Sequence, residues 1–443
     1  ADGGENPVAL LVGETVAEGF TANNLTIEST GDYAVNYLGG GSMALQDSAI
    51  TVTGSGAKAG LHSTGGQLAV INTVFSGGAK NAVFEDSVEK SSLVNCSAAS
   101  GELTWEAPDT VSVIQDPDNI TQGIDDDAIA QADAARAFQD KGPAKDQLFA
   151  AADYGIAAPD RNVDISAALQ AAIDAAAAAG GGVVYVPKGA YRLEQPIVVK
   201  SGVELQGSTD YMHYVRIDTT VFLTDYGKAQ EDAQPLITLE ENAGIRGFNI
   251  VYDKVTQETI QPYATTIQGQ GADAYIVNVT AVGGWYIADF NSHRCDRHYI
   301  EGLNFFTFKT GIAVGGGSEN GVVINGHANP GALWDSGYTD YKWDSSWEGP
   351  LMTYLHENVV GFYVGETKNQ VNFMTFIFGS KNGIRIDDGA DVTVIGHGTD
   401  FSATGIHLTG NANAVIFDPQ LIGTYSSEKY QSTAIVADRN FTG

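Results

Sequence analysis

The chain has 443 residues, including 53 glycines and 12 prolines, and its formal net charge is −31. Such an acidic protein lacks the basic surface that nucleic acids and anionic membranes require, and its field also disfavours polyanionic substrates. No run of 18 apolar residues is present, so the sequence predicts no membrane span. Two cysteines about 200 positions apart, Cys96 and Cys295, are expected to be free buried thiols, and a disulfide between them is the alternative.

Residues 1–105 contain short alternating runs separated by glycine, such as "NLTIES" (24–29), "SAITVTG" (48–54) and "QLAVINTVF" (67–75). Strands that recur at such intervals with glycine turns predict a β-rich, solenoid-like subdomain. An ordinary β-sandwich is the alternative.

Residues 106–148 differ, because they are alanine-rich and acidic and are punctuated by Pro108, Pro117 and Pro143. We expect a linker here, with a short helix within residues 124–140. The third part, residues 149–443, is predicted to be the catalytic domain.

Residues 153–207 open this third part with a helix followed by short strands. Asp164 or Ser166 can cap a helix that runs to Ala179, and three consecutive glycines then end it. Within this helix Leu169, Ala172 and Ile173 form an apolar stripe, and the runs "VVYVP", "GAYRL", "PIVV" and "VELQG" follow.

The motifs "DYG" (153–155), "ALQAAIDAAAAAGGGVVYVPKGAY" (168–191) and "LQG" (205–207) resemble the start of the pectate-lyase-like right-handed β-helix superfamily. The resemblance implies an all-β chain folded as a right-handed parallel β-helix, with a capping α-helix over its first coil. It does not choose an activity, because hydrolases, lyases, transferases and phage tailspikes share the fold. Downstream, "NGIRI" (382–386) and "TGIHL" (404–408) lie one coil apart.

The stretch "WYIADFNSHRCDRHYIEG" (285–302) gathers charged residues in a chain that is only 17% charged. Alternation along a strand predicts that Tyr286, Ala288 and Phe290 point inward. Trp285, Ile287 and Asp289 would then point outward, as in the floor of a carbohydrate-binding groove.

Asp296 follows seven residues later, in a segment whose composition is typical of a turn. A bend would bring it beside Asp289, with Asp289 protonated against apolar neighbours and Asp296 ionised. The groups expected around Asp296, which could also bind substrate, are His293, Arg294, Arg297 and His298. The alternative is that both aspartates cap turns and pair with arginines.

Two aspartates seven residues apart, downstream of such a cap, resemble glycoside hydrolase family 136, which comprises retaining lacto-N-biosidases with a β-helix. The resemblance implies that the two aspartates are the acid/base and the nucleophile, and the protonation states expected above make Asp289 the acid/base. It implies no cofactor or metal. It also implies a second polypeptide or chaperone subunit that covers an end of the solenoid.

An aromatic insertion at residues 327–349 interrupts the coil rhythm, and its rings could stack on sugar faces. Its candidate substrate-binding residues are Trp334, Asp335, Tyr338 and Trp343, and a self-packed surface loop is the alternative. Glu301 is expected to reach the same groove and bind a hydroxyl. His293 and His298 lack further metal ligands. The "RIDDGAD" run (385–391) resembles a polygalacturonase-type paired aspartate, but a turn explains it better.

The sequence therefore predicts a secreted or cell-surface bacterial glycoside hydrolase that acts on a neutral oligosaccharide, with lacto-N-biosidase as the specific expectation. A polysaccharide lyase and a fructan-processing transferase of the same fold are the enzymatic alternatives. A non-catalytic adhesin or tailspike is the third class.

Overall fold

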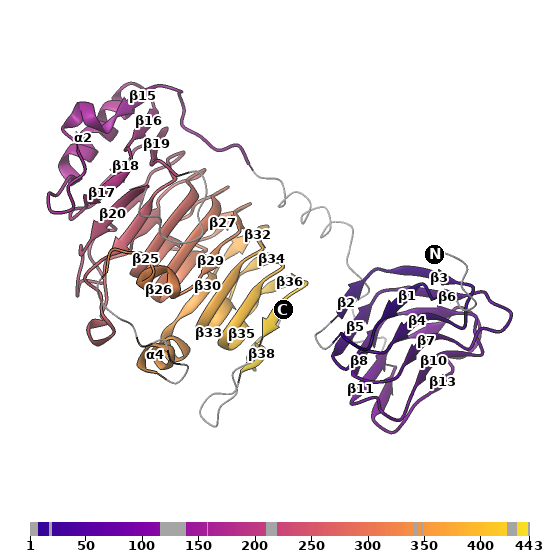
Figure 1. The fold of residues 1–443 in the computed structure, drawn as a ribbon. Coiled ribbons are helices and arrows are strands. Elements are labelled where there is room, and N and C mark those ends of the chain that lie inside the picture. Colours follow the sequence, from indigo (N-terminus) through magenta and orange to yellow (C-terminus); the bar gives the residue numbers. More distant parts are fainter. Residues whose placement is uncertain are drawn as a thin grey trace. The chain divides into compact units, whose positions relative to one another are not determined.

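A computed structural model describes residues 8–16, 20–115, 139–156, 158–209, 219–339, 344, 346, 349–422 and 432–441. The chain divides into two compact units, Ala1–Asp126 and Asp127–Gly443, which are described separately (Figure 1). Each has its own apolar core, and no residue belongs to both cores.

The first unit is a small solenoid in which every strand pair is parallel. Parallel pairing throughout excludes the β-sandwich alternative, because a sandwich is antiparallel. Its three sheets contain β1 (Leu10–Val12), β4 (Tyr33–Tyr37), β7 (Ala59–Ser63), β10 (Lys80–Phe84) and β13 (Trp105–Glu106); β2 (Phe20–Asn23), β5 (Ser42–Gln46), β8 (Gln67–Ile71), β11 (Ser91–Val94) and β14 (Val111–Ile114); and β3 (Thr26–Ser29), β6 (Ala49–Val52), β9 (Val74–Ser76) and β12 (Ser97–Ala98).

The first unit's strands continue into the stretch that the sequence predicts as a linker, since β14 pairs with β11. The helix predicted within residues 124–140 lies, apart from residues 139 and 140, outside the described residues.

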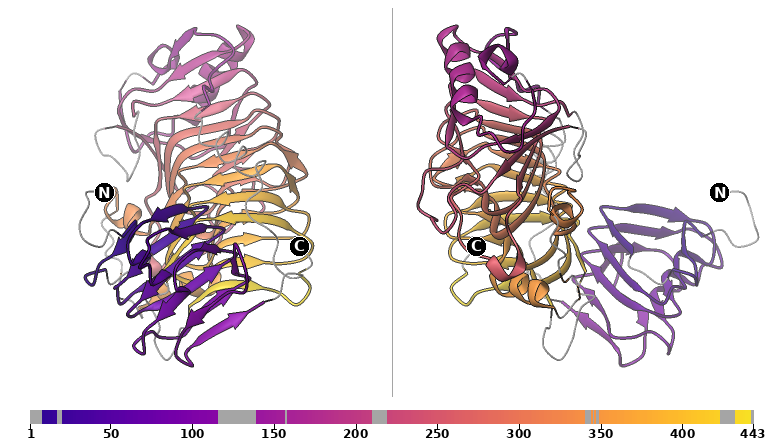
Figure 2. Two further views of the ribbon diagram at one scale, coloured as in Figure 1. Left: turned by 90° about the vertical axis from the view of Figure 1, so that its right-hand side faces the viewer. Right: turned by 60° about the vertical axis from the view of Figure 1, so that its left-hand side comes forward.

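The second unit confirms the predicted parallel β-helix. Figure 2 shows its strands stacked along the whole length of the unit. Three strands per coil build three columns, which we call the first, second and third faces.

The first face contains β16 (Gly182–Tyr185), β19 (Val203–Gln206), β22 (Gly244–Arg246), the starts of β25 (Tyr275–Phe290) and β26 (Tyr299–Val314), β28 (Val322–Ile324), β32 (Gln370–Phe373), β34 (Asp391–Ile395) and β36 (Asn413–Phe417), with β15 (Leu148–Ala150) before it. The second contains β17 (Gly189–Arg192), β20 (Thr220–Thr224), β23 (Asn249–Tyr252), the middles of β25 and β26, β29 (His327–Ala328), the starts of β33 (Phe376–Ile386) and β35 (Gly398–Leu408), and β37 (Gln420–Ile422).

The third face contains β18 (Ile197–Val199), β21 (Ile237–Leu239), β24 (Ile267–Gly269), the ends of β25 and β26, β30 (Val360–Val364), the ends of β33 and β35, and β38 (Thr433–Ala437). Outside the three faces lie β27 (Ser318–Glu319), β31 (Thr367–Lys368), the short helices η1 (Ala151–Tyr154), η2 (Gln257–Thr259) and α3 (Gly331–Trp334), and α4 (Pro350–Asn358).

Helix α2 (Ser166–Ala178) covers the first coil, as the sequence predicts. The Ser166 backbone N–H donates to Asp164 Oδ1 at 3.0 Å, and Gly180 has the positive φ of a helix end, +87°. Leu169, Ala172 and Ile173 are buried against the core. A solenoid's end coil exposes apolar side chains and strand edges, and α2 hides both.

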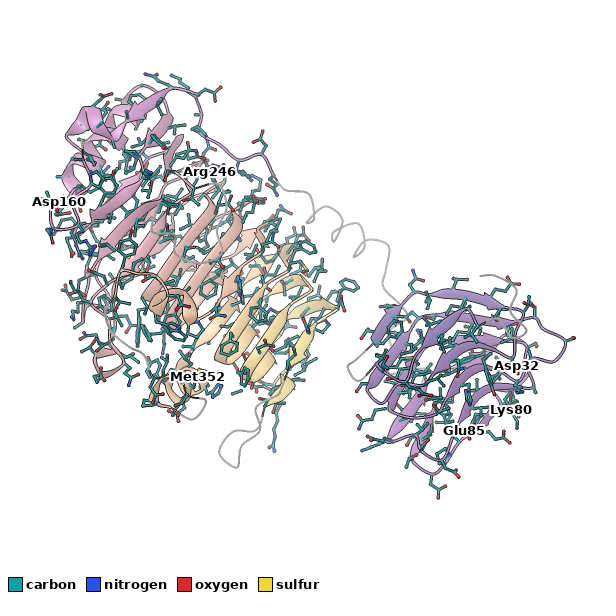
Figure 3. All side chains as sticks on the ribbon, in the orientation of Figure 1. Asp32, Lys80, Glu85, Asp160, Arg246 and Met352 are labelled. Carbon is teal, nitrogen blue, oxygen red and sulfur yellow. The ribbon has the colours of Figure 1, made fainter. Side chains whose placement is uncertain are left out.

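The outward side of the first face is covered. The segment before β15 crosses it, with the Gln139 N–H donating to the Tyr299 hydroxyl at 3.1 Å and Arg246, labelled in Figure 3, donating to the Lys141 carbonyl. Outward residues of this face form a separate buried apolar cluster of Tyr275, Val277, Tyr299, Val322 and Ile324. This surface is therefore structural.

Candidate functional site

The third face presents polar side chains to solvent. On the second face, by contrast, every residue of β20 and β23 is buried, outward-pointing positions included. One outward residue per coil is in register along the third face. After the buried Thr238 these residues are Gln268, Asp289, Ala313, Tyr363, Arg385 and His407. We call this series the Gln268–His407 row. Its half-buried polar and aromatic members make it the candidate functional surface.

Asp289 lies near the middle of this row, between the buried residues Ala288 and Phe290. Its Oδ1 accepts hydrogen bonds from the backbone N–H groups of Asn291 and Ser292, both at 2.9 Å. Its Oδ2 accepts one from Gln268 Nε2 at 2.9 Å. The carboxyl group is therefore held in one orientation at the end of the strand.

The apolar setting that the sequence predicts for Asp289 is wrong. Ile287 is fully buried and Trp285 is only 9% exposed, so neither forms an outward groove floor. The alternation fails because β25 has register shifts around Gly284 as it turns from the second to the third face. Tyr286 takes the outward position instead of pointing into the core.

Tyr286 links the row to a long loop at the corner between the second and third faces. Its hydroxyl donates to Glu231 Oε1 at 3.0 Å. Burial, the bond to Glu231 and the nearby charge of Asp289 raise the pKa of Tyr286 to about 12. This side chain therefore stays a neutral hydrogen-bond donor, placed between two carboxylates.

Asp296 lies in the turn that connects the third face to the first. Both of its oxygens accept from Arg294 Nε, at 2.9 and 3.0 Å, and Oδ1 also accepts from the Glu319 N–H at 2.9 Å. Partial burial opposes ionisation, but these bonds outweigh it and lower the pKa of Asp296. The expectation that this group is ionised agrees with its surroundings.

The turn brings both aspartates close to one buried thiol. Burial raises the pKa of Cys295 to about 12, and the charges of Asp289 and Asp296 add to the shift. Cys295 is a free, buried cysteine, as is Cys96 in the first unit. The charges of both aspartates thus reach Cys295, and the placement of the two carboxylates side by side stays a prediction.

The basic residues of the turn do not form the predicted substrate-binding cluster. Arg294 also donates to Glu319, and Arg297 pairs with Asp273 through Nε and Nη2, at 3.1 and 2.6 Å. Both guanidinium groups are thus committed to carboxylates of neighbouring coils. His293 is exposed at the turn.

His298 is a core residue and cannot contact a substrate. It is fully buried, its Nδ1 bonds to the Cys295 carbonyl at 2.8 Å, and its ring lies 5.5 Å from that of Phe290. Burial lowers the pKa of His298 to about 4, so the ring is neutral at neutral pH. The expectation of a binding role fails because the chain turns inward at this position.

Glu301 is also placed differently from its prediction. After the turn the chain enters the first face, where Glu301 accepts a hydrogen bond from the Tyr299 hydroxyl at 2.8 Å. It therefore lies on a different face from Asp289. Sequence distance alone cannot show this, because the change of face occurs within residues 291–298.

The aromatic insertion flanks the corner between the second and third faces. Leu333 of α3 lies against Gly283, at the corner of β25. Trp334 and Tyr338 are half-buried against the core, Asp335 is exposed, and the Arg161 guanidinium lies 6.0 Å from the Tyr338 ring centre. Trp343 lies outside the described residues. Further along, Met352 of α4, labelled in Figure 3, lies against Gly379.

Five residues near the row carry polar contacts that sequence analysis does not select as site residues: Glu231, Gln268, Tyr363, Arg385 and Asp387. Arg385 Nε donates to Asp387 Oδ1 at 2.8 Å, and the Thr409 hydroxyl donates to the same oxygen at 2.8 Å. Burial raises the pKa of Asp387, but the bonds from Arg385 and Thr409 outweigh it and lower the pKa. The coil spacing of "NGIRI" and "TGIHL" was the available signal for this part of the row.

Within the described residues, no group of three or more histidine, cysteine, aspartate or glutamate side chains is arranged to hold a metal ion. No helix among them is long and apolar enough to cross a membrane.

Residues 149–314 match a family described as rhamnogalacturonase A/epimerase, pectate lyase-like. This match contains Asp289 and Asp296 and agrees with the resemblance found in residues 153–207. No curated protein matches the chain significantly.

Several solved structures are similar to this chain. A hyperthermoactive exopolygalacturonase from Thermotoga maritima is 12% identical over 70% of this chain and 90% of that one, with a TM-score of 0.42. DFA-IIIase from Arthrobacter chlorophenolicus A6 is 11% identical over 66% and 92%, with a TM-score of 0.37. Tailspike protein gp49 of Acinetobacter baumannii bacteriophage Fri1 is 13% identical over 67% and 63%, with a TM-score of 0.28. Identities this low carry no information about substrate.

Proposed function

We propose that this protein is a glycoside hydrolase that binds an oligosaccharide along its third face and cleaves it beside Asp289. The observation that carries the proposal is the fixed carboxyl group of Asp289 in the middle of the Gln268–His407 row. The pectate-lyase-like match over the same coils supports the carbohydrate-active class.

The contacts of Asp289 suit a residue that alternates between an acid and a base. In the ionised state Gln268 donates to Oδ2, and Gln270 Nε2 in turn donates to Gln268 Oε1 at 2.9 Å. Rotating both amides by half a turn exchanges their donor and acceptor atoms. The Gln268 amide oxygen would then accept a hydrogen bond from the O–H of a protonated Asp289, so both states keep a hydrogen bond.

The more specific proposal is a retaining lacto-N-biosidase that releases lacto-N-biose from milk-type oligosaccharides. Asp289 would protonate the leaving oxygen and Asp296, which stays ionised, would attack the sugar. Such an enzyme would act outside the bacterial cell, secreted or at its surface. A second polypeptide or chaperone subunit would cover an end of the solenoid.

A polysaccharide lyase is less well supported. Lyases of this fold usually need an arginine or lysine base, and Arg294 and Arg297 are both committed to carboxylates. Arg385, whose Nε donates to Asp387, lies three strand spacings from Asp289 along the third face.

The test is turnover of lacto-N-tetraose by the Asp289→Asn and Asp296→Asn variants. Loss of an acid/base or nucleophile is expected to lower kcat by about 10²- to 10⁴-fold or more without unfolding the protein. Asp174→Asn, at an exposed acid of the capping helix α2, is the matched control. Activity near wild type in either variant removes that residue from the chemistry.

Product analysis separates the classes of reaction. Nuclear magnetic resonance of the first product anomer distinguishes retention from inversion, and ultraviolet absorbance of an unsaturated product identifies a lyase. Absence of turnover on a broad panel of glycans contradicts the enzymatic proposal.

A further inference from the structure

Arg385, on the third face, has N–H donors that make no hydrogen bond to the described part of the protein. Its Nε donates to Asp387, and within the described part of the chain neither of its Nη groups has a hydrogen-bond partner. Arg192, Arg294 and Arg297, in contrast, each donate to carboxylates through two nitrogens. The two outer nitrogens of this partly exposed side chain are therefore left for a ligand.

The orientation of this guanidinium is fixed before any ligand arrives. Asp387 holds Nε at 2.8 Å, and Asp387 is itself held by the Thr409 hydroxyl. A planar group anchored on one edge presents its other edge as a fork, the geometry that binds a carboxylate through two parallel hydrogen bonds. The charges of Asp387 and Asp438 both act on Arg385, so the subsite would attract a carboxylate through directed donors and not through net positive charge.

Arg385 and Asp289 belong to the same row, three strand spacings apart, with Ala313 and Tyr363 between them. At about 4.8 Å per spacing, this is roughly 14 Å along the face. Ala313 and Gly315 are small, and the half-buried Tyr363 ring lies just before Arg385, so a sugar chain can run from one residue to the other.

We propose that Tyr363 and Arg385 form a subsite for one acidic sugar unit, bound through its carboxylate, a few units away from the bond at Asp289. The substrate would then be an oligosaccharide that is neutral where it is cleaved and carries a single carboxylate further along. This inference rests on the proposed function, because it assumes that the oligosaccharide lies along the row with its cleaved bond at Asp289. The carboxylate itself can belong to a uronic acid or a sialic acid.

Binding, measured without turnover, tests the subsite. Titration calorimetry would use the full chain carrying Asp289→Asn, with two matched pairs of ligands. Sialylated lacto-N-tetraose is compared with lacto-N-tetraose, and glucuronosyl-xylotriose with its methyl ester. The acidic member of at least one pair is expected to bind about 10- to 100-fold more tightly, and the pair that responds identifies the acid.

Arg385→Gln should abolish this preference, and Arg385→Lys should restore part of it, because lysine keeps the charge but lacks the fork. Lys381→Gln removes an exposed cation from the same strand and should change nothing. Equal affinities within both pairs, or a preference that survives Arg385→Gln, overturn the subsite. Binding of the acid without hydrolysis of any glycan by the unmutated chain would instead contradict the proposed function alone.

Discussion

Hydrogen-bond partners separate the carboxylates of this protein into different roles. Asp296 and Asp387 accept from arginines and have lowered pKa values. Within the described residues, Asp289 has no basic hydrogen-bond partner and accepts from two backbone N–H groups and an amide. Bonds from arginines therefore favour the ionised form of Asp296 and Asp387, the state that a nucleophile needs, whereas uncharged donors orient Asp289.

Gln268 is expected to position Asp289. Gln268→Glu places a second carboxylate beside Oδ2. Because two adjacent carboxylates resist ionising together, Asp289 should keep its proton to higher pH, and the basic limb of the pH–rate profile should move to higher pH. Gln268→Ala should lower kcat about 10-fold with little change in KM and no such movement. The measurement is kcat as a function of pH on the best substrate. Identical profiles for all three proteins would show that the amide is only structural.

The buried His298 should make the fold acid-sensitive. Its pKa in the folded state is about 4, against about 6.5 in an unfolded chain. Between these values the unfolded chain binds a proton that the folded chain does not, so stability is lost as the pH falls through that window. At pH 5 the loss is about 2 kcal/mol relative to pH 7.

Urea unfolding of the His298→Asn variant at both pH values checks this prediction, since asparagine can still donate to the Cys295 carbonyl. The variant should lose less stability than wild type on acidification. His293→Asn, at the exposed histidine of the same turn, should leave the pH dependence as it is. If His298→Asn loses as much stability between pH 7 and pH 5 as wild type, the acid sensitivity comes from other groups. One such group is His397, because burial lowers its pKa to about 3.

The helices and strands differ in how well their positions and buried faces can be predicted from the sequence. The α2 cap is readable because its stripe of Leu169, Ala172 and Ile173 follows helical spacing and glycines mark its end. Alternation correctly places Asp289 outward and Ala288 and Phe290 inward. It fails at Trp285 and Ile287, because a local register shift reverses the faces and leaves no mark in composition.

The corners between faces determine which residues of the site cannot be predicted from the sequence. A parallel coil brings residues together that are about 20 to 60 positions apart, as in Glu231 with Tyr286. No short motif encodes that distance, so Glu231 and Gln268 could not be selected from the sequence. Nearness to Asp296 in the sequence predicts that Glu301 belongs to the site, although a change of face separates the two residues.

The cap is expected to contribute measurably to the stability of the second unit. Leu169→Ala removes a fully buried side chain between α2 and the first coil, which should cost about 2–5 kcal/mol. Ala171→Ser, on the exposed side of the same helix, should cost less than about 1 kcal/mol. Chemical unfolding of the two variants gives the comparison. A similar small loss in both would mean that the helix packs only loosely on the coil.

At the scale of the whole molecule, two separate cores imply two separate unfolding events. Leu61 lies in the core of the first unit and Leu205 in that of the second, and both are fully buried. Leu61→Ala should lower the melting temperature of one calorimetric transition and Leu205→Ala that of the other. If either variant shifts both transitions together, the units stabilise each other.

The in-register row gives the third face the properties of a ruler. Each coil adds one outward residue at a spacing of about 4.8 Å. The register of these residues is fixed, because a shift of a single residue would turn a buried side chain outward. The length of glycan that spans Asp289 and Arg385 is therefore set by the number of coils between them and not by loop flexibility. Removing or inserting a whole coil would rescale the preferred chain length in discrete steps.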